Sequence, residues 1–213
     1  MNNIKTNYEK NISSINNSIS IYQYLQTQAK NLDAKILLRS QFVLIVSAFD
    51  TYIHSVVINR VIDQFFSSEQ QLNIQLDIPL NLAFEMKNLT DNMQKRNKLY
   101  NFLVKKLSKD SFQSPKSIEY AFSIIGINKI WTKLGGKMGM QPEDVKNILS
   151  IIVKRRNKIA HESDWNVITG TYEDIELSDV LDCRDFIGNM VNAIYDIISS
   201  GNNMATENQI DKN

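Results

Sequence analysis

The sequence predicts an all-α protein, and two observations carry that prediction. Its 213 residues include only seven glycines and three prolines, so few positions break or turn the chain. Apolar residues recur at spacings of three and four along almost the whole length, which is the period of an amphipathic helix. We therefore expect a helical bundle in which residues 1–200 form a single domain and residues 201–213 a flexible C-terminal tail.

The first two expected helices differ in how they are buried. The N-terminal helix has one apolar stripe and a polar, asparagine-rich back, and the stripe consists of Ile4, Tyr8, Ile12, Ile15, Ile19 and Tyr22. Residues 33–66 are apolar on more than one face, so the helix that they form belongs in the middle of the bundle. A polar connection at 67–79 leads to a further helix that extends from about Leu89 to Leu107.

The second half of the chain begins irregularly and then returns to long helices. We expect a short helix at 115–125, a left-handed stop at Gly126, and a loop at 135–139, where the sequence reads GGKMG without the spacing of a phosphate loop. Pro142 starts the next helix, with acidic residues in its first turn. Ser178 is the expected N-cap of a last helix that ends at Gly201.

Composition excludes several classes of protein. The formal net charge is +1, so any surface for nucleic acid must be local. The single cysteine, Cys183, leaves neither an internal disulfide nor a multi-cysteine zinc site. The stretch FVLIVSAF at 42–49 is too short to span a bilayer, and the N-terminal residues lack the apolar core of a signal peptide. We expect a cytoplasmic protein without membrane contact.

One stretch, RRNKIAHESDW at 155–165, combines a histidine with a cluster of cations. Lys154, Arg155, Arg156 and Lys158 precede His161, and cations near a helix C-terminus also interact favourably with the helix dipole, which is the structural explanation. Asn157 and His161 are four residues apart and share a face, whereas Arg156 and His161 are about 140° apart around the axis. Convergence of these two side chains requires the length of arginine, a helix that ends at the histidine, or a second copy across a two-fold axis.

The run R156-N-K-I-A-H161 at the end of an amphipathic helix resembles the R-x4-6-H signature of the HEPN superfamily. The longer run RRNKIAHESD, with a final helix about 15 residues on, is similar to the RiboL-PSP-HEPN group, as is the apolar helix that contains SAFDTYIHSVV. The resemblance covers about residues 33–200, so the fold it implies is a HEPN-type bundle with extra N-terminal and central helices. Some HEPN toxins carry a tyrosine two residues after the histidine, where this chain has Ser163, so a role for that tyrosine does not transfer.

The resemblance implies an endoribonuclease that needs no metal or other cofactor, acts as a homodimer with a composite active site, and belongs to a prokaryotic defence or toxin system. His161 is then the general acid or base, because an imidazole exchanges protons near neutral pH. Arg156 stabilises charge on the phosphate, and Asn157 orients the imidazole or binds a phosphate oxygen. Lys154, Arg155 and Lys158 supply the local basic surface for RNA. An antitoxin or defence partner is a further expectation.

Other residues near this stretch have two interpretations each. Asp50 pairs with Arg155 or Arg156, or forms an ordinary internal salt bridge. Glu162 and Asp164 hydrogen-bond His161, or only cap the chain as it leaves the helix. Three further side chains favour packing: His54, Trp131 and Trp165, of which Trp165 is close enough in sequence to stack on a base. The sequence offers no recognisable metal site.

Two other classes of function compete with the enzyme. A catalytically silent HEPN module binds RNA, a nucleotide or a partner protein, and the presence of both Arg156 and His161 counts against it. A purely structural dimerisation bundle is favoured only if the basic cluster is buried against acids of its own chain. RNA as the partner, and cleavage by the 2′-hydroxyl to give 2′,3′-cyclic phosphate and 5′-hydroxyl ends, are the leading expectations.

Overall fold

A computed structural model of the chain describes residues 1–29, 33–67 and 76–210, with side chains up to residue 200, and it confirms the all-α class. The described residues form eight helices and one small antiparallel hairpin. They divide into two compact units, one made of Met1–Tyr52 and Trp131–Asn213 and the other of Ile53–Ile130. That the chain folds as a single domain stays a prediction.

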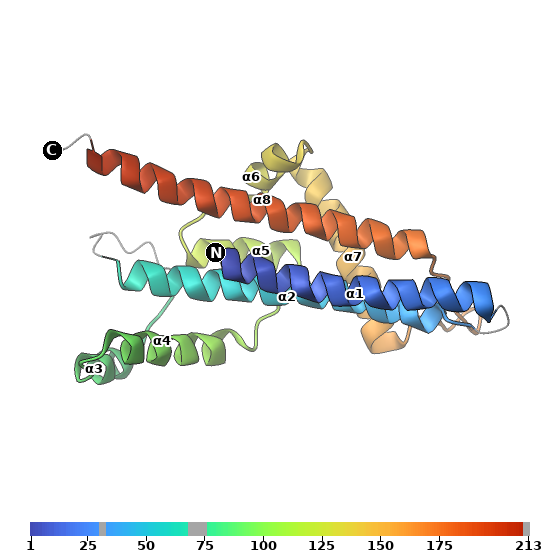
Figure 1. The fold of residues 1–213 in the computed structure, drawn as a ribbon, viewed down its shortest axis with the longest axis horizontal. Helices are drawn as coiled ribbons and strands as arrows, with labels where there is room; N and C mark the ends of the chain where they lie inside the picture. Colours follow the sequence, from blue (N-terminus) through green and yellow to red (C-terminus); the bar gives the residue numbers. More distant parts are fainter. Residues whose placement is uncertain (30–32, 68–75, 211–213) are drawn as a thin grey trace. The chain divides into compact units, whose positions relative to one another are not determined.

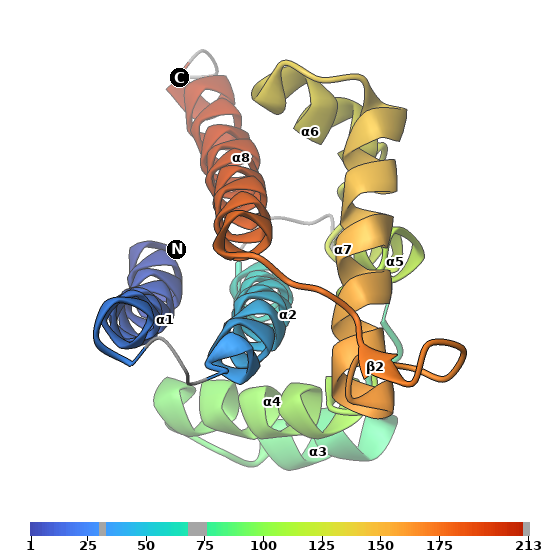
Figure 2. The same cartoon turned by 90° about the vertical axis from the view of Figure 1, so that its right-hand side faces the viewer.

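Besides the short helix α6 (Ile130–Met138), the first unit contains three long helices that lie side by side and one that crosses them (Figures 1 and 2). The three are α1 (Asn2–Gln28), the part of α2 (Lys35–Phe65) up to Tyr52, and α8 (Leu177–Ile210), and the crossing helix is α7 (Pro142–Glu162). The predicted stripe of α1 is buried at Tyr8, Ile15, Ile19 and Tyr22. The Tyr8 and Tyr52 rings pack with their centroids 5.7 Å apart, which joins α1 to α2.

The central position predicted for α2 is confirmed by its burial. Phe49, Val46 and Ala48 are all buried within the first unit, and the Val46 and Ala48 side chains leave the helix about 160° apart. Among the described helices, α2 alone is long and apolar enough to cross a membrane. More than half of its most apolar stretch is buried inside the protein.

The second unit holds the remainder of α2 with α3 (Leu80–Lys87), α4 (Asn92–Leu107) and α5 (Pro115–Ile124). Helix α3 was not predicted, and most of the polar connection expected at 67–79 lies outside the described residues. The carboxylate of Asp91 accepts from the Met93 amide at 2.9 Å and so starts α4. Gly126 has a φ of 74° after α5, which confirms the predicted left-handed stop.

The loop predicted at the glycine-rich stretch is wrong, because Gly135 and Gly136 lie inside α6 (Ile130–Met138). A Cβ atom at Gly135 would lie 2.7 Å from the Met140 carbonyl oxygen, so a side chain there would block the turn that follows the helix. The left-handed residue of that turn is Gly139, with a φ of 66°. Glycine disfavours a helix by only about 1 kcal/mol, which neighbouring contacts offset.

Of the last two long helices, α7 agrees with the prediction and α8 differs from it at both ends. Helix α7 begins at Pro142 as predicted, with Glu143 and Asp144 in its first turn. Helix α8 begins at Leu177, so Ser178 is not its N-cap; the Asp179 carboxylate instead accepts from the Glu176 amide at 2.8 Å. The expected end at Gly201 is also wrong, because α8 continues to Ile210. The flexibility predicted for 201–213 stays a prediction.

Candidate functional site at the end of helix α7

The cations at 154–158 and His161 all lie on one continuous helix, α7. It ends at Glu162, one residue beyond His161, and Ser163 and Asp164 then adopt left-handed φ angles of 52° and 58°. The backbone amides of both residues donate to the Lys158 carbonyl, so the chain folds back over the last turn of the helix. The helix therefore does not break between Arg156 and His161, and the two side chains leave it in different directions.

The chain that follows α7 forms a small hairpin. Strands β1 (Trp165–Asn166) and β2 (Thr171–Tyr172) pair antiparallel, with Trp165 opposite Tyr172 and Asn166 opposite Thr171. The Glu173 amide donates to the Asp164 carbonyl at 2.8 Å and extends this pairing toward the helix. This hairpin was not predicted, because its strands are only two residues long.

Asp164 links the end of α7 to α2 in what we call the Asp164 clamp, formed with Arg39 and Arg155. The Asp164 side chain is fully buried, and its Oδ2 accepts from Arg39 Nε at 3.0 Å and from Arg155 Nη2 at 2.8 Å. Both guanidiniums also bind the segment that follows the hairpin, since Arg39 donates to the Glu173 carbonyl and Arg155 to the Asp174 carbonyl. A buried carboxylate is tolerated here because two cations share it.

A second set of ion pairs surrounds the clamp. Lys158 donates to the Glu173 carboxylate at 2.6 Å, and Asn166 donates to the same oxygen at 3.0 Å. Lys35, in the first turn of α2, pairs with the carboxylates of Asp174 and Glu176. The acids in the segment after the hairpin thus neutralise cations from both α2 and α7.

These contacts shift the titration of the groups involved. The hydrogen bond from Lys158 holds the pKa of Glu173 below its ordinary value, and the hydrogen bond from Lys35 does the same for the pKa of Asp174. In return, the hydrogen bond to Asp174, followed by that to Glu176, raises the pKa of Lys35. The segment after the hairpin therefore stays ionised at neutral pH.

The remaining polar residues of the motif form a separate group on α7. Lys154, Asn157 and His161 are exposed and lie on one helical face, and none of them has an acidic partner among the described residues. Arg156 Nη1 donates to the Asn157 side-chain oxygen at 3.1 Å. Asn157 lies between Arg156 and His161 around the helix axis, so this hydrogen bond draws the guanidinium toward the histidine face.

The predicted site residues on α7 therefore fall into two groups. Arg156, Asn157, His161 and Lys154 remain available on the surface, whereas Arg155 and Lys158 are paired with acids of their own chain. The interactions proposed for Asp50 with Arg155 or Arg156 stay predictions; Arg155 bonds Asp164 and the Asp174 carbonyl, and Arg156 bonds Asn157.

The neighbouring acids and aromatic residues also have defined places. Neither Glu162 nor Asp164 hydrogen-bonds His161 in the described part of the chain; Asp164 closes the helix end instead. His54 belongs to the second unit, where its ring packs 4.3 Å from that of Phe112 and its Nε2 lies 3.2 Å from the Leu107 carbonyl. The packing expected for Trp131 is confirmed by its burial.

The sequence reasoning missed Arg39, Lys35, Glu173 and Asp174. Arg39 lies 125 residues before Asp164, so no local pattern signals their contact. A weak signal existed in the acid-rich run 173–176, which reads EDIE and balances the cations of 154–158. Such a balance between acids and cations signals that they pair within the chain, but it does not identify which side chains pair.

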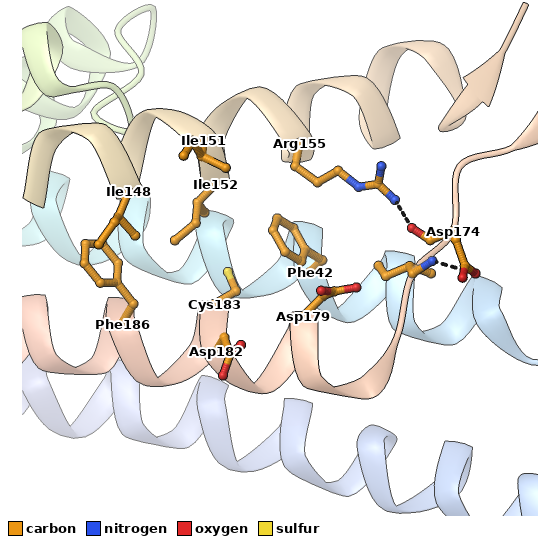
Figure 3. A pocket seen from close by; sticks show the side chains of 11 residues that line it. Phe42, Ile148, Ile151, Ile152, Arg155, Asp174, Asp179, Asp182, Cys183 and Phe186 are labelled. Carbon is orange, nitrogen blue, oxygen red and sulfur yellow. Dashed lines mark hydrogen bonds between the residues drawn. The ribbon is translucent and has the colours of Figure 1, made fainter. Parts of the chain in front are cut away.

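A pocket of about 410 Å³ lies between α7 and α8, next to Arg155 (Figure 3). Its walls are mainly hydrocarbon, and Asp179 and Asp182 lie along one side. Burial raises the pKa of the Cys183 thiol in its floor to about 12, so the sulfur stays protonated. Because the Arg155 guanidinium at its edge bonds the Asp164 carboxylate and the Asp174 carbonyl, the lining residues offer no unpaired cation to a phosphate.

The described residues contain no group of three histidine, cysteine, aspartate or glutamate side chains arranged to hold a metal ion. The chemical groups that the α7 surface presents are an imidazole, a guanidinium, an ammonium and a carboxamide. Such a set binds anions and transfers protons.

The fold and this surface define an all-helical protein with an Arg-x4-His motif at the end of a long helix. A family model described as RiboL-PSP-HEPN matches residues 7–200. The chain therefore belongs to the RiboL-PSP-HEPN family, as the motif predicted. The match also includes most of α1, so the similarity to the family begins nearer the N-terminus than the expected range of about 33–200. Neither curated proteins nor solved structures include a significant match to the chain.

Proposed function

We propose that the protein is a metal-independent endoribonuclease that uses His161 and Arg156. The observation that carries this proposal is that some polar residues of α7 are paired with acids and others are not. Arg155 and Lys158 are neutralised by buried or neighbouring acids, while Arg156, Asn157, His161 and Lys154 have no acidic partner in the described residues. A cation and an imidazole that the fold leaves unneutralised at a surface are available to a phosphodiester.

Each residue of this group has a role in attack by the RNA 2′-hydroxyl on the adjacent phosphorus. His161 removes the hydroxyl proton or protonates the leaving 5′-oxygen, and the bond from phosphorus to that oxygen breaks as the new bond forms. Arg156 donates to the phosphate oxygens as negative charge builds on them. Asn157 holds the guanidinium through its side-chain oxygen, and Lys154 attracts the backbone. The products are a 2′,3′-cyclic phosphate and a 5′-hydroxyl.

A composite site made by two copies follows from the direction of the side chains. Helix α7 continues through both residues, so Arg156 and His161 of one copy leave the axis about 140° apart. The Arg156 bond to Asn157 narrows this separation, and a two-fold axis near His161 would place the arginine of one copy beside the histidine of the other. A homodimer is therefore part of the proposal.

The competing function is a catalytically silent module that binds RNA, a nucleotide or a partner protein. The pairing of Arg155 and Lys158 within the chain favours it, because these cations no longer contribute to a broad basic surface. It fits the same family but requires no proton transfer by His161. A structural bundle is less well supported, since the pairing with internal acids does not extend to Arg156 or Lys154.

The setting of the proposed enzyme rests on the family alone. We infer a cytoplasmic protein of a prokaryotic defence or toxin system, whose partner is RNA and whose activity an antitoxin or another defence protein restrains. Copurification of a neighbouring gene product that suppresses cleavage would support this setting.

The experiment that tests the function compares four proteins on total cellular RNA: the native chain and the variants Arg156→Ala, His161→Ala and Arg155→Ala. We expect the first two variants to lose about 10²- to 10⁴-fold in cleavage rate with little change in melting temperature. Arg155→Ala is the matched control, because it removes the same group one residue away but breaks the Asp164 clamp. It should lower the melting temperature. Native protein that binds RNA without cutting it would favour the silent module.

A further inference from the structure

The hairpin that follows α7 exposes an unusual amount of apolar surface. Ile168 and Val167 at its tip are 96% and 86% exposed, and the two aromatic residues at its base, Trp165 and Tyr172, are also exposed. Neighbouring apolar side chains rarely stay in water without a partner to cover them. The stretch 165–172, which reads WNVITGTY, has no charged residue.

The tip is held by its own hydrogen bonds. The Asn166 side-chain oxygen accepts from the amides of Ile168 and Thr169 at 2.9 and 3.2 Å, and the Gly170 amide donates to the Asn166 carbonyl at 2.9 Å. Gly170 has a φ of 67°, a conformation in which glycine is unstrained. The turn therefore presents Val167 and Ile168 outward in a defined conformation.

The base of the hairpin is fixed to the same helix end that carries the proposed catalytic residues. Lys158 and Asn166 share the Glu173 carboxylate, and Arg39 lies 5.0 Å from the centre of the Tyr172 ring. Trp165 packs edge to face on Tyr172, with ring centroids 5.1 Å apart. In Figure 2 the hairpin projects from the C-terminal end of α7, where His161 is four residues before Trp165.

We propose that this hairpin binds an unpaired RNA base by stacking on Trp165, next to the phosphate that Arg156 and His161 bind. The inference rests on the proposed function and adds to it a base-binding site on the hairpin. Aromatic faces stack on any unpaired base, whereas paired bases in a duplex are covered by their neighbours. The hairpin stretch has no charged side chain to pair with a phosphate. We therefore expect the hairpin to contact bases and the α7 surface to contact the RNA backbone.

The chain carries its own reporter for this contact. It has two tryptophans, and Trp131 is 4% exposed whereas Trp165 is 41% exposed. Stacking of a base on Trp165 should therefore quench part of the emission without affecting Trp131. A 2′-O-methyl oligonucleotide serves as the probe, because its blocked hydroxyl prevents cleavage during the measurement.

The experiment titrates the full-length native protein with this oligonucleotide, single-stranded and as a duplex. We expect quenching by the single strand at concentrations that leave the duplex without effect. Trp165→Ser should weaken binding about 5- to 100-fold. Tyr24→Ser is the control, because Tyr24 is an exposed aromatic residue of α1, and it should bind as the native protein does.

Two outcomes would overturn the proposal. One is that folded Trp165→Ser protein binds the oligonucleotide with unchanged affinity and that the oligonucleotide does not quench the native protein. The quenching measurement needs no variant. The other is that Trp165→Ser and the double variant Val167→Ser, Ile168→Ser both lose self-association in light scattering and both keep the native RNA affinity, which would make the hairpin a contact between copies. Because the probe is not cleaved, quenching without any RNase activity would refute the enzyme and keep the stacking site.

Discussion

Replacement of Asp164 by asparagine should destabilise the protein strongly through loss of one buried charge. The carboxylate is fully buried and is shared by Arg39, whose side chain is 7% exposed, and Arg155, whose side chain is 26% exposed. Asparagine keeps nearly the same shape and tolerates the φ of 58° at this position, so the backbone should not be strained. The change therefore isolates the effect of charge.

The magnitude follows from the two cations that are left behind. Removal of one partner from a buried ion pair typically costs about 3 to 5 kcal/mol. The lower end applies here, because Arg155 is partly exposed and can regain contact with water. A loss of about 3 kcal/mol corresponds to a melting temperature lower by about 6 to 12 °C for a chain of this size.

The assay is urea unfolding followed by circular dichroism, together with thermal melting. Asp182→Asn is the control, since Asp182 is an exposed acid of α8 in no ion pair within the described residues; it should change stability by less than about 0.5 kcal/mol. Adding Arg39→Met to Asp164→Asn should recover part of the loss, because it removes one of the unpaired cations. A loss below about 1 kcal/mol for Asp164→Asn would refute the role of the clamp.

Three further predictions concern the assembly, the reaction and the response to acid. A cysteine introduced at Lys154 should crosslink two copies under oxidation, since α7 is proposed to lie near a two-fold axis, and a monomer in light scattering at micromolar concentration would contradict this. Cleavage should persist in EDTA, because the proposed chemistry uses only His161 and Arg156; recovery by added magnesium after loss in chelator would rule that chemistry out. Acidification should destabilise the native protein more than the Glu173→Gln variant. The pKa of Glu173 in the folded protein lies below its ordinary value of 4.5. Its stabilising contribution is therefore complete above pH 4.5 and disappears as the pH falls through the folded pKa. Thermal melts of both proteins at pH 6 and pH 3 would measure this loss.

The sequence by itself determined the features that depend on near neighbours in the chain. Helical periodicity predicted the class and the long helices, and the start of α7 at Pro142 and the stop at Gly126 followed from the backbone preferences of proline and glycine. The motif at 156–161 predicted the family for the same reason, because all of its residues lie within two turns of one helix. Local rules failed where packing overrides them, as at Gly135 and at the start of α8.

The tertiary structure alone decided which residues of the basic cluster are available. Arg155 and Arg156 are adjacent and chemically identical, so no property of the sequence separates them. Successive side chains on a helix point about 100° apart, and this rotation directs Arg155 toward Asp164 while Arg156 bonds Asn157. The other partner of Asp164, Arg39, comes from a helix 125 residues earlier in the chain. Only the packing of α2 against the end of α7 brings these charges together, because contacts between distant residues depend on the fold rather than on local sequence preference.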